Sequence, residues 1–180
     1  LSYGMVNLPE GKMKSREGTV VDADELVDTL TSLARKEIEA KEREALVDDV
    51  EKTSQSIALG ALNYYLLQVT PTKDMIFNPA ESISFNGNTG PYLQYMGARI
   101  SSMLRKYESE YADIQKLGFN SSLLTLSDER ELIKQIALYP EVVEKAGASY
   151  DPSLLCTYLY DLSKLFSRWY HDNPVLKAAT

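Results

Sequence analysis

Apolar residues recur at helical spacing through most of the chain, and this periodicity constrains the fold more than any other feature of the sequence. The widest apolar stripe lies between Pro152 and Asn173. Its members are Leu154, Leu155, Tyr158, Leu159, Leu162, Leu165, Phe166 and Trp169. A stripe of this width is typical of a helix that is covered on several sides, so we expect a central core helix here.

Four earlier segments also predict helices. They run from Asp22 through the charged stretch 36–43, from Val50 to Val69, from Tyr92 to about Tyr107, and from Ser127 to about Lys145. Pro140 should kink or break the last of these, because proline removes a helical N–H. Residues 1–9 are apolar and predict a short extended segment with no partner strand nearby in the sequence. The sequence therefore predicts an all-α fold, a bundle of about five helices behind a short extended lead-in.

The connection between the second and third predicted helices has signals of its own. Two apolar runs, 75–77 and 83–85, should pack this connection down against the helices. The run 86–91, Asn-Gly-Asn-Thr-Gly-Pro, is a dense turn signal, and Pro91 suits the first turn of the next helix. It resembles a phosphate-cradling loop only superficially, because it lacks a Walker lysine and does not clearly follow a strand. Gly60, inside the second helix, would permit a close helix contact.

The composition is that of one soluble domain of 180 residues, with 44% hydrophobic and 25% charged residues. No apolar run approaches the roughly 18 residues of a membrane span, and the N-terminus lacks the regions of a signal peptide. Cys156 and His171 are the single cysteine and histidine, which leaves no ligand set for a structural zinc. We therefore expect a cytoplasmic protein without a structural metal.

The net charge of −7 argues mildly against nucleic-acid binding, which depends on neutralising phosphates. The charge is unevenly spread, however. Acidic residues crowd the segment 22–51, whereas residues 152–180 hold three lysines and arginines against two aspartates. The net charge therefore does not decide the partner.

One short loop near the start has a composition that suits phosphate chemistry. Lys12, Lys14, Ser15 and Arg16 lie between two glycines, and the β-branched run 19–21 follows. Point charges and directed donors on an easily bent loop make a phosphate clamp. The alternative interpretation is a solvated basic turn.

The end of the last predicted helix is a second candidate site. Trp169 extends the core stripe, whereas Tyr170 lies around the helix from it and should be partly exposed beside Arg168, His171 and Asn173. An exposed aromatic ring next to cations and an amide is a platform for an unstacked base. A tyrosine half-buried at the end of a bundle fits the sequence equally well.

Other catalytic chemistries lack support. Paired carboxylates such as Asp48 and Asp49 have no partner for acid–base work and are typical of a solvated helix face. Serine, histidine and aspartate all occur, but no Gly-x-Ser-x-Gly turn is present, so a nucleophilic triad is not predicted.

Three segments in order resemble one protein family. Residues 12–21, Lys-Met-Lys-Ser-Arg-Glu-Gly-Thr-Val-Val, resemble the KMSKS loop of class I aminoacyl-tRNA synthetases in its arginyl-tRNA synthetase version. Residues 84–95, Ser-Phe-Asn-Gly-Asn-Thr-Gly-Pro-Tyr-Leu-Gln-Tyr, continuing to Ala98 and Arg99, closely resemble a segment typical of arginyl-tRNA synthetases. Residues 131–176 resemble the helical anticodon-binding domain of that family. The resemblance covers nearly the whole chain.

The resemblance implies ATP-dependent attachment of arginine to its tRNA through an arginyl-adenylate. Its implied catalytic residues are Lys12, Lys14, Ser15 and Arg16. Lys12 and Ser15 would contact the ATP phosphates, and Lys12 would stabilise the charge on the leaving pyrophosphate. Ser15 and Arg16 replace the last two residues of the usual loop, so Lys14 or Arg16 would substitute for its second lysine. Magnesium is expected with ATP in the full enzyme, with no metal site in this part.

The resemblance also places an aromatic residue near the anticodon at Tyr170, with Trp169 and His171 as its neighbours. These three are the implied tRNA-binding residues, and the partners are arginine tRNA, arginine and ATP, without a membrane.

The implied domain division assigns residues 1–21 to the tail of a catalytic domain and residues 22–180 to a tRNA-binding region. The nucleotide-binding domain is then expected upstream of Leu1 and a final helix beyond Thr180, so we expect this part to be inactive alone. The alternative is a helical protein-interaction module that uses its acidic first helix, with the basic loop as a turn.

Overall fold

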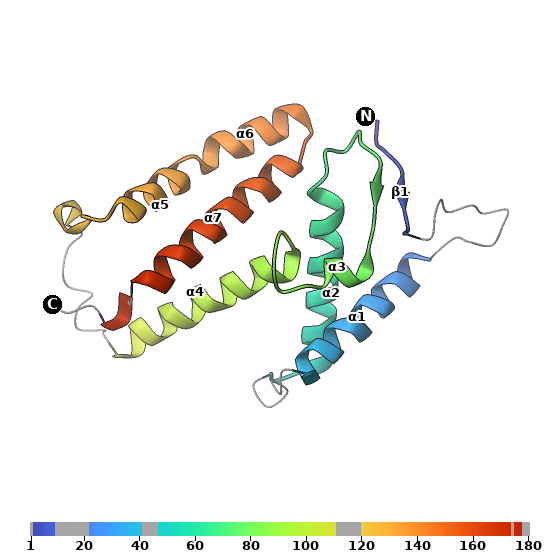
Figure 1. The fold of residues 1–180 in the computed structure, drawn as a ribbon, viewed down its shortest axis with the longest axis horizontal. Coiled ribbons are helices and arrows are strands. Elements are labelled where there is room, and N and C mark those ends of the chain that lie inside the picture. Colours follow the sequence, from blue (N-terminus) through green and yellow to red (C-terminus); the bar gives the residue numbers. More distant parts are fainter. Residues whose placement is uncertain (1, 10–21, 41–46, 111–119, 174, 178–180) are drawn as a thin grey trace.

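The computed structural model describes residues 2–9, 22–40, 47–110, 120–173 and 175–177 (Figure 1). Their elements are β1 (Val6–Asn7), α1 (Ala23–Ala40), α2 (Val50–Leu67), β2 (Met75–Ile76), α3 (Pro79–Ser82), α4 (Gly90–Glu110), α5 (Ser127–Ala137), α6 (Tyr139–Ser149) and α7 (Ser153–Asp172), with 3₁₀ turns at Ser121–Leu123 and Val175–Lys177. This arrangement confirms the predicted all-α bundle with a short extended lead-in. No helix in the described ranges is long and apolar enough to cross a membrane.

The first half of the chain is built on α1 and α2, which pack side by side (Figure 1). Leu30 from α1 and Ala58 from α2 are fully buried and meet Phe77 from the connection after β2. Ile83, just after α3, is buried against Ala61 in α2. The two apolar runs of the connection therefore pack down as the sequence predicts.

The lead-in finds a partner strand that local sequence signals did not indicate. β1 pairs in parallel with β2, with Val6 opposite Met75 and Asn7 opposite Ile76. The backbone N–H of Met5 donates to the carboxylate of Asp74 at 2.7 Å and extends this contact. The partner lies 69 residues along the chain, so no local pattern connects the two.

The second half consists of α4, α5, α6 and α7. The helices α5 and α6 follow one another along one side of α7, and α4 runs along its other side (Figure 1). The predicted fourth helix is two helices separated at Leu138. Pro140 lies in the first turn of α6, where a missing N–H removes no helical hydrogen bond.

The last helix is central in position, because α7 packs against α2, α4, α5 and α6, but it is not the most deeply buried helix. α7 lies between α4 and the α5–α6 pair, but Leu159 in its stripe is 41% exposed. Its buried residues are Ser153, Cys156 and Tyr158, whereas the fully buried aliphatic side chains lie on α1 and α2. An apolar stripe indicates which face of a helix turns inward, not how many neighbours cover that face.

The two halves meet where α2 crosses the start of α4. A Cβ atom on Gly90 would lie 2.1 Å from the backbone oxygen of Gly60, so both backbones approach closely at this crossing. The predicted close contact at Gly60 is confirmed.

Candidate nucleic-acid interface

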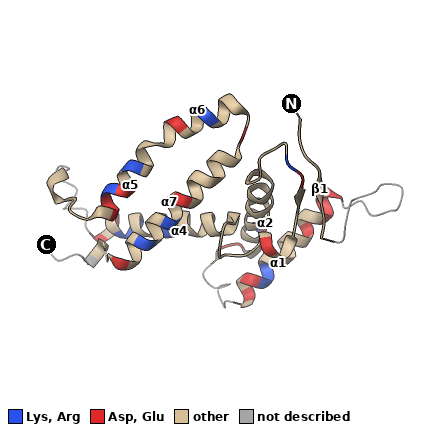
Figure 2. Cartoon of the chain, turned by 45° about the horizontal axis from the view of Figure 1, so that its top comes forward, with Lys and Arg blue, Asp and Glu red and all other residues tan. Residues whose placement is uncertain are grey.

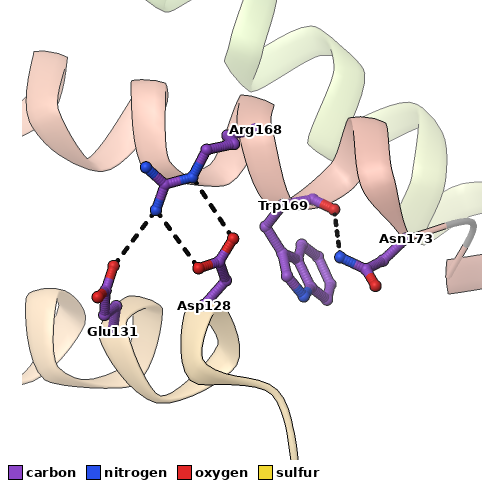
Figure 3. Close-up of polar contacts among 5 residues, drawn as sticks. All are labelled: Asp128, Glu131, Arg168, Trp169 and Asn173. Carbon is purple, nitrogen blue, oxygen red and sulfur yellow. Dashed lines mark hydrogen bonds and ion pairs between the residues drawn. The ribbon is translucent and has the colours of Figure 1, made fainter.

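The candidate aromatic site is held at the last turn of α7. Asn173 has extended backbone angles, φ −126° and ψ 105°, as expected for a residue that precedes a proline. Its side-chain Nδ2 donates to the carbonyl of Trp169 at 2.8 Å (Figure 3). Its backbone N–H donates to the same carbonyl at 3.0 Å. These two bonds end the helix directly after residues 169–171 and fix their backbone.

Tyr170 is partly buried between α7 and α4. Its ring stacks on Phe166, with centroids 5.6 Å apart and planes inclined by 20°. The guanidinium carbon of Arg99, on α4, lies 4.4 Å from the centroid of the Tyr170 ring. This cation–π contact brings a cation and an aromatic ring from distant parts of the sequence to one place.

Trp169 and His171 take different positions from Tyr170. The Trp169 ring lies against Phe166, with centroids 6.0 Å apart, and its Nε1 atom is buried without a hydrogen-bond partner among the described residues. His171 is exposed on a neighbouring hollow. The structure thus places the three predicted tRNA-binding residues on one helical turn but does not turn them toward one surface.

Tyr170 lines a cleft of about 980 Å³ between the ends of α1 and α7 and the helices α2 and α4. Among the described residues, Lys52, Arg99 and Lys106 bring three cations to its walls, and Glu37 contributes a single carboxylate. Its aromatic lining residues are Phe85, Tyr95 and Tyr170. Figure 2 shows lysine and arginine positions along α4, whereas aspartate and glutamate positions prevail on α1.

The hollow beside His171 is smaller, about 670 Å³, and lies among α4, α5 and α7. Arg99, Lys164, Arg168 and His171 line it together with the carboxylates of Glu131, Asp161 and Asp172. Cations and carboxylates are therefore mixed here, which suits a polyanion less well than the cleft does.

Arg168 forms ion pairs with two acidic residues on α5. Its Nε lies 3.4 Å from Asp128 Oδ2, and its Nη2 lies 3.3 Å from Glu131 Oε2 (Figure 3). Both acids lie three residues apart, on one face of α5. Arg168 thereby connects α7 to α5 directly before residues 169–171.

The predicted catalytic residues Lys12, Lys14, Ser15 and Arg16 lie outside the described residues. Their roles stay predictions. Within the described ranges, no group of three or more histidine, cysteine, aspartate or glutamate side chains could hold a metal ion.

Sequence reasoning missed Lys52, Lys106 and Phe85 as members of the cleft. Arg99 was named at the end of the segment that begins at residue 84, but its contact with Tyr170 depends on the packing of α4 against α7.

Two family models match the chain. One, described as the DALR anticodon binding domain, matches residues 93–180. The other, described as the catalytic domain of class I (R) tRNA synthetases, matches residues 1–79. The chain is also 61% identical over 178 residues to an arginine–tRNA ligase of Treponema denticola and 54% identical to one of Treponema pallidum. The chain belongs to the arginyl-tRNA synthetase family.

Solved structures agree with this membership. The chain superimposes on the arginyl-tRNA synthetase of Thermus thermophilus with a TM-score of 0.85 and 31% identity, over 99% of this chain and 29% of that one. The Plasmodium falciparum enzyme matches over 96% of this chain and 28% of that one, with a TM-score of 0.73 and 23% identity, which shows the shared fold. The aligned region is 98% of this chain and 30% of each Treponema arginyl-tRNA synthetase. The catalytic-domain match includes α1 and α2, and the division at residue 21 stays a prediction.

Proposed function

We propose that this chain is part of an arginine–tRNA ligase that attaches arginine to its tRNA in the cytoplasm, through an arginyl-adenylate made from ATP. Its membership of the arginyl-tRNA synthetase family supports the reaction. Lys12 and Ser15 contact the ATP phosphates, and Lys14 or Arg16 supplies the second cation of the loop. Magnesium bound with ATP in the full enzyme would neutralise part of the phosphate charge. The 180-residue chain alone is expected to be inactive.

The described helices bind tRNA, and the cleft between α2, α4 and α7 is the proposed contact. The observation that carries this proposal is the cleft's lining, which within the described part of the chain has three cations against one carboxylate, in a protein of net charge −7. Lys52 and Lys106 meet backbone phosphates, whose charge dominates nucleic-acid affinity. Tyr95 is 42% exposed and offers its ring to an unstacked base. Tyr170 joins it when a base displaces the Arg99 guanidinium from its ring, and each stacking contact contributes about 1–3 kcal/mol.

The proposal is tested by measuring the affinity of the full-length protein for arginine tRNA over a range of salt concentrations. Lys106→Ala removes one phosphate contact, so the slope of log affinity against log salt should become shallower by about 1. Lys145→Ala is the matched control, because this exposed lysine lies on α6 and outside the cleft. Equal slopes for both variants would contradict the proposed cleft.

The stacking role is tested in the same assay with Tyr170→Ala. We expect a loss of affinity on the order of tenfold, because one base–aromatic contact disappears. An unchanged affinity would exclude stacking on Tyr170. A protein-interaction module would instead bind arginine tRNA no better than an unrelated acidic polymer such as heparin.

A further inference from the structure

A buried tyrosine hydroxyl joins three segments at the crossing of the two halves. Tyr64, on α2, is 8% exposed. Its hydroxyl donates to the carbonyl of Cys156, on α7, at 3.0 Å, and it lies 2.5 Å from the side-chain oxygen of Asn88, in the turn before α4. These partners lie 92 and 24 residues away in the sequence. One hydroxyl therefore connects α2 with the beginnings of α4 and α7.

The count of protons decides how this junction is bonded. A phenol has one proton, but the Cys156 carbonyl and the Asn88 side-chain oxygen are both acceptors. The hydroxyl therefore shares its one proton between the two oxygens, and the shorter contact, to Asn88 Oδ1, has the length of an O–H···O bond. Burial raises the pKa of Tyr64 far above its usual value, so the hydroxyl keeps this proton.

The backbone around this hydroxyl is tightly packed. A Cβ on Gly90 would clash with the Gly60 carbonyl, so α2 and the start of α4 touch directly. One turn further along α4, the Gln94 side chain donates to the carbonyl of Ser56 at 2.9 Å. These contacts fix where α4 leaves α2, and the Tyr64 hydroxyl adds α7 to the same joint.

The direction of α4 at this joint sets the position of the far end of the cleft. α4 has 21 residues and is therefore about 30 Å long. A rotation of about 5° at Gly90 would move its other end by about 3 Å, given that length. Arg99 and Lys106 line the cleft and lie on α4, so such a rotation would displace both side chains.

We propose that Tyr64 is a positioning residue for tRNA, whose hydroxyl fixes α4 and α7 relative to α2. This inference rests on the proposed function. The segment 1–79 matches the catalytic-domain family and the segment from 93 onward matches the anticodon-binding family, so the joint lies between the two matched regions. A tRNA that contacts both regions at once requires a fixed angle between them, because misplacement by even an ångström weakens productive binding.

The experiment compares Tyr64→Phe with Tyr65→Phe in the full-length enzyme, by steady-state aminoacylation well below the melting temperature. Tyr65→Phe is a matched control, because its hydroxyl faces Glu81 at 3.4 Å, at the end of α3 and away from α7. For Tyr64→Phe we expect the KM for arginine tRNA to rise on the order of fivefold. Its kcat and its KM values for ATP and arginine should stay near those of the unchanged enzyme.

A merely structural role would reduce the fraction of active enzyme, which lowers kcat and leaves the KM for tRNA unchanged. That result, or an equal rise in KM for Tyr65→Phe, would overturn the inference.

If Tyr64→Phe does not fold, Asn88→Ala tests the inference instead. Asn88 is exposed, and removal of its amide breaks the same joint. A raised KM for tRNA with an unchanged kcat supports the inference, and an unchanged KM overturns it. If the unchanged enzyme fails to charge arginine tRNA, the proposed function falls and the inference falls with it.

Discussion

Among single residues, Gly90 and Gly97 show how differently two glycines of one helix are used. A Cβ on Gly90 would lie 2.1 Å from a backbone oxygen that cannot move aside, whereas a Cβ on Gly97 would meet nothing within 4 Å. Gly90 therefore sets the crossing of α2 and α4, and Gly97 does not contribute to packing.

This contrast gives a prediction about stability. Gly90→Ala should lower the free energy of unfolding by about 1–3 kcal/mol, because the added methyl forces the two backbones apart. Gly97→Ala should raise it by up to about 1 kcal/mol, because alanine favours the helix. Denaturant unfolding of the full-length protein, followed through the transition of the helical region, measures both changes. Equal effects would show that the crossing is looser than described.

Residue-level inference from the sequence succeeded where the signal was local. Pro91 in the first turn of α4 and the close contact at Gly60 both follow from backbone chemistry at one position. The environment of Tyr170 does not, because Arg99 reaches the ring only after α4 packs against α7. The sequence indicated an aromatic ring at the end of a helix, and tertiary packing supplied its partners.

For whole elements, apolar periodicity located the helices well, because each one buries a single face. It did not by itself separate α5 from α6, since the apolar spacing continues past Leu138, but Pro140 predicted a kink or break and the structure confirms one at Leu138. It also could not pair β1 with β2, because two-residue strands depend on a partner elsewhere in the chain. The arrangement of elements therefore had to come from tertiary structure.

The link between α5 and α7 gives a prediction at this scale. Arg168 and its partners Asp128 and Glu131 are substantially exposed, so solvent screens their attraction. A double-mutant cycle with Arg168→Ala and Asp128→Ala should give a coupling of at most about 1 kcal/mol. Raising the salt concentration should reduce that coupling further. A coupling of several kcal/mol that ignores salt would mean that this link is a buried, desolvated ion pair.

In the whole molecule, two regions that match different family models share one compact joint. The sequence alone suggested both regions through the segments 12–21, 84–95 and 131–176. It did not suggest the cleft, because Lys52, Arg99 and Tyr170 are brought together from α2, α4 and α7. Binding surfaces assembled from distant segments are visible only once the helices are packed.

The central claim, that tRNA lies in the cleft between α2, α4 and α7, is tested most directly by ultraviolet crosslinking of the full-length protein to arginine tRNA, with the crosslinked peptides mapped by mass spectrometry. Tyr139 and Tyr150, on the α5–α6 side, are exposed by 51% and 70% and serve as internal controls for exposed tyrosines outside the cleft. The account predicts crosslinks at Tyr95 and Tyr170, with Tyr139 and Tyr150 free of them. Crosslinks confined to Tyr139 and Tyr150 would contradict it.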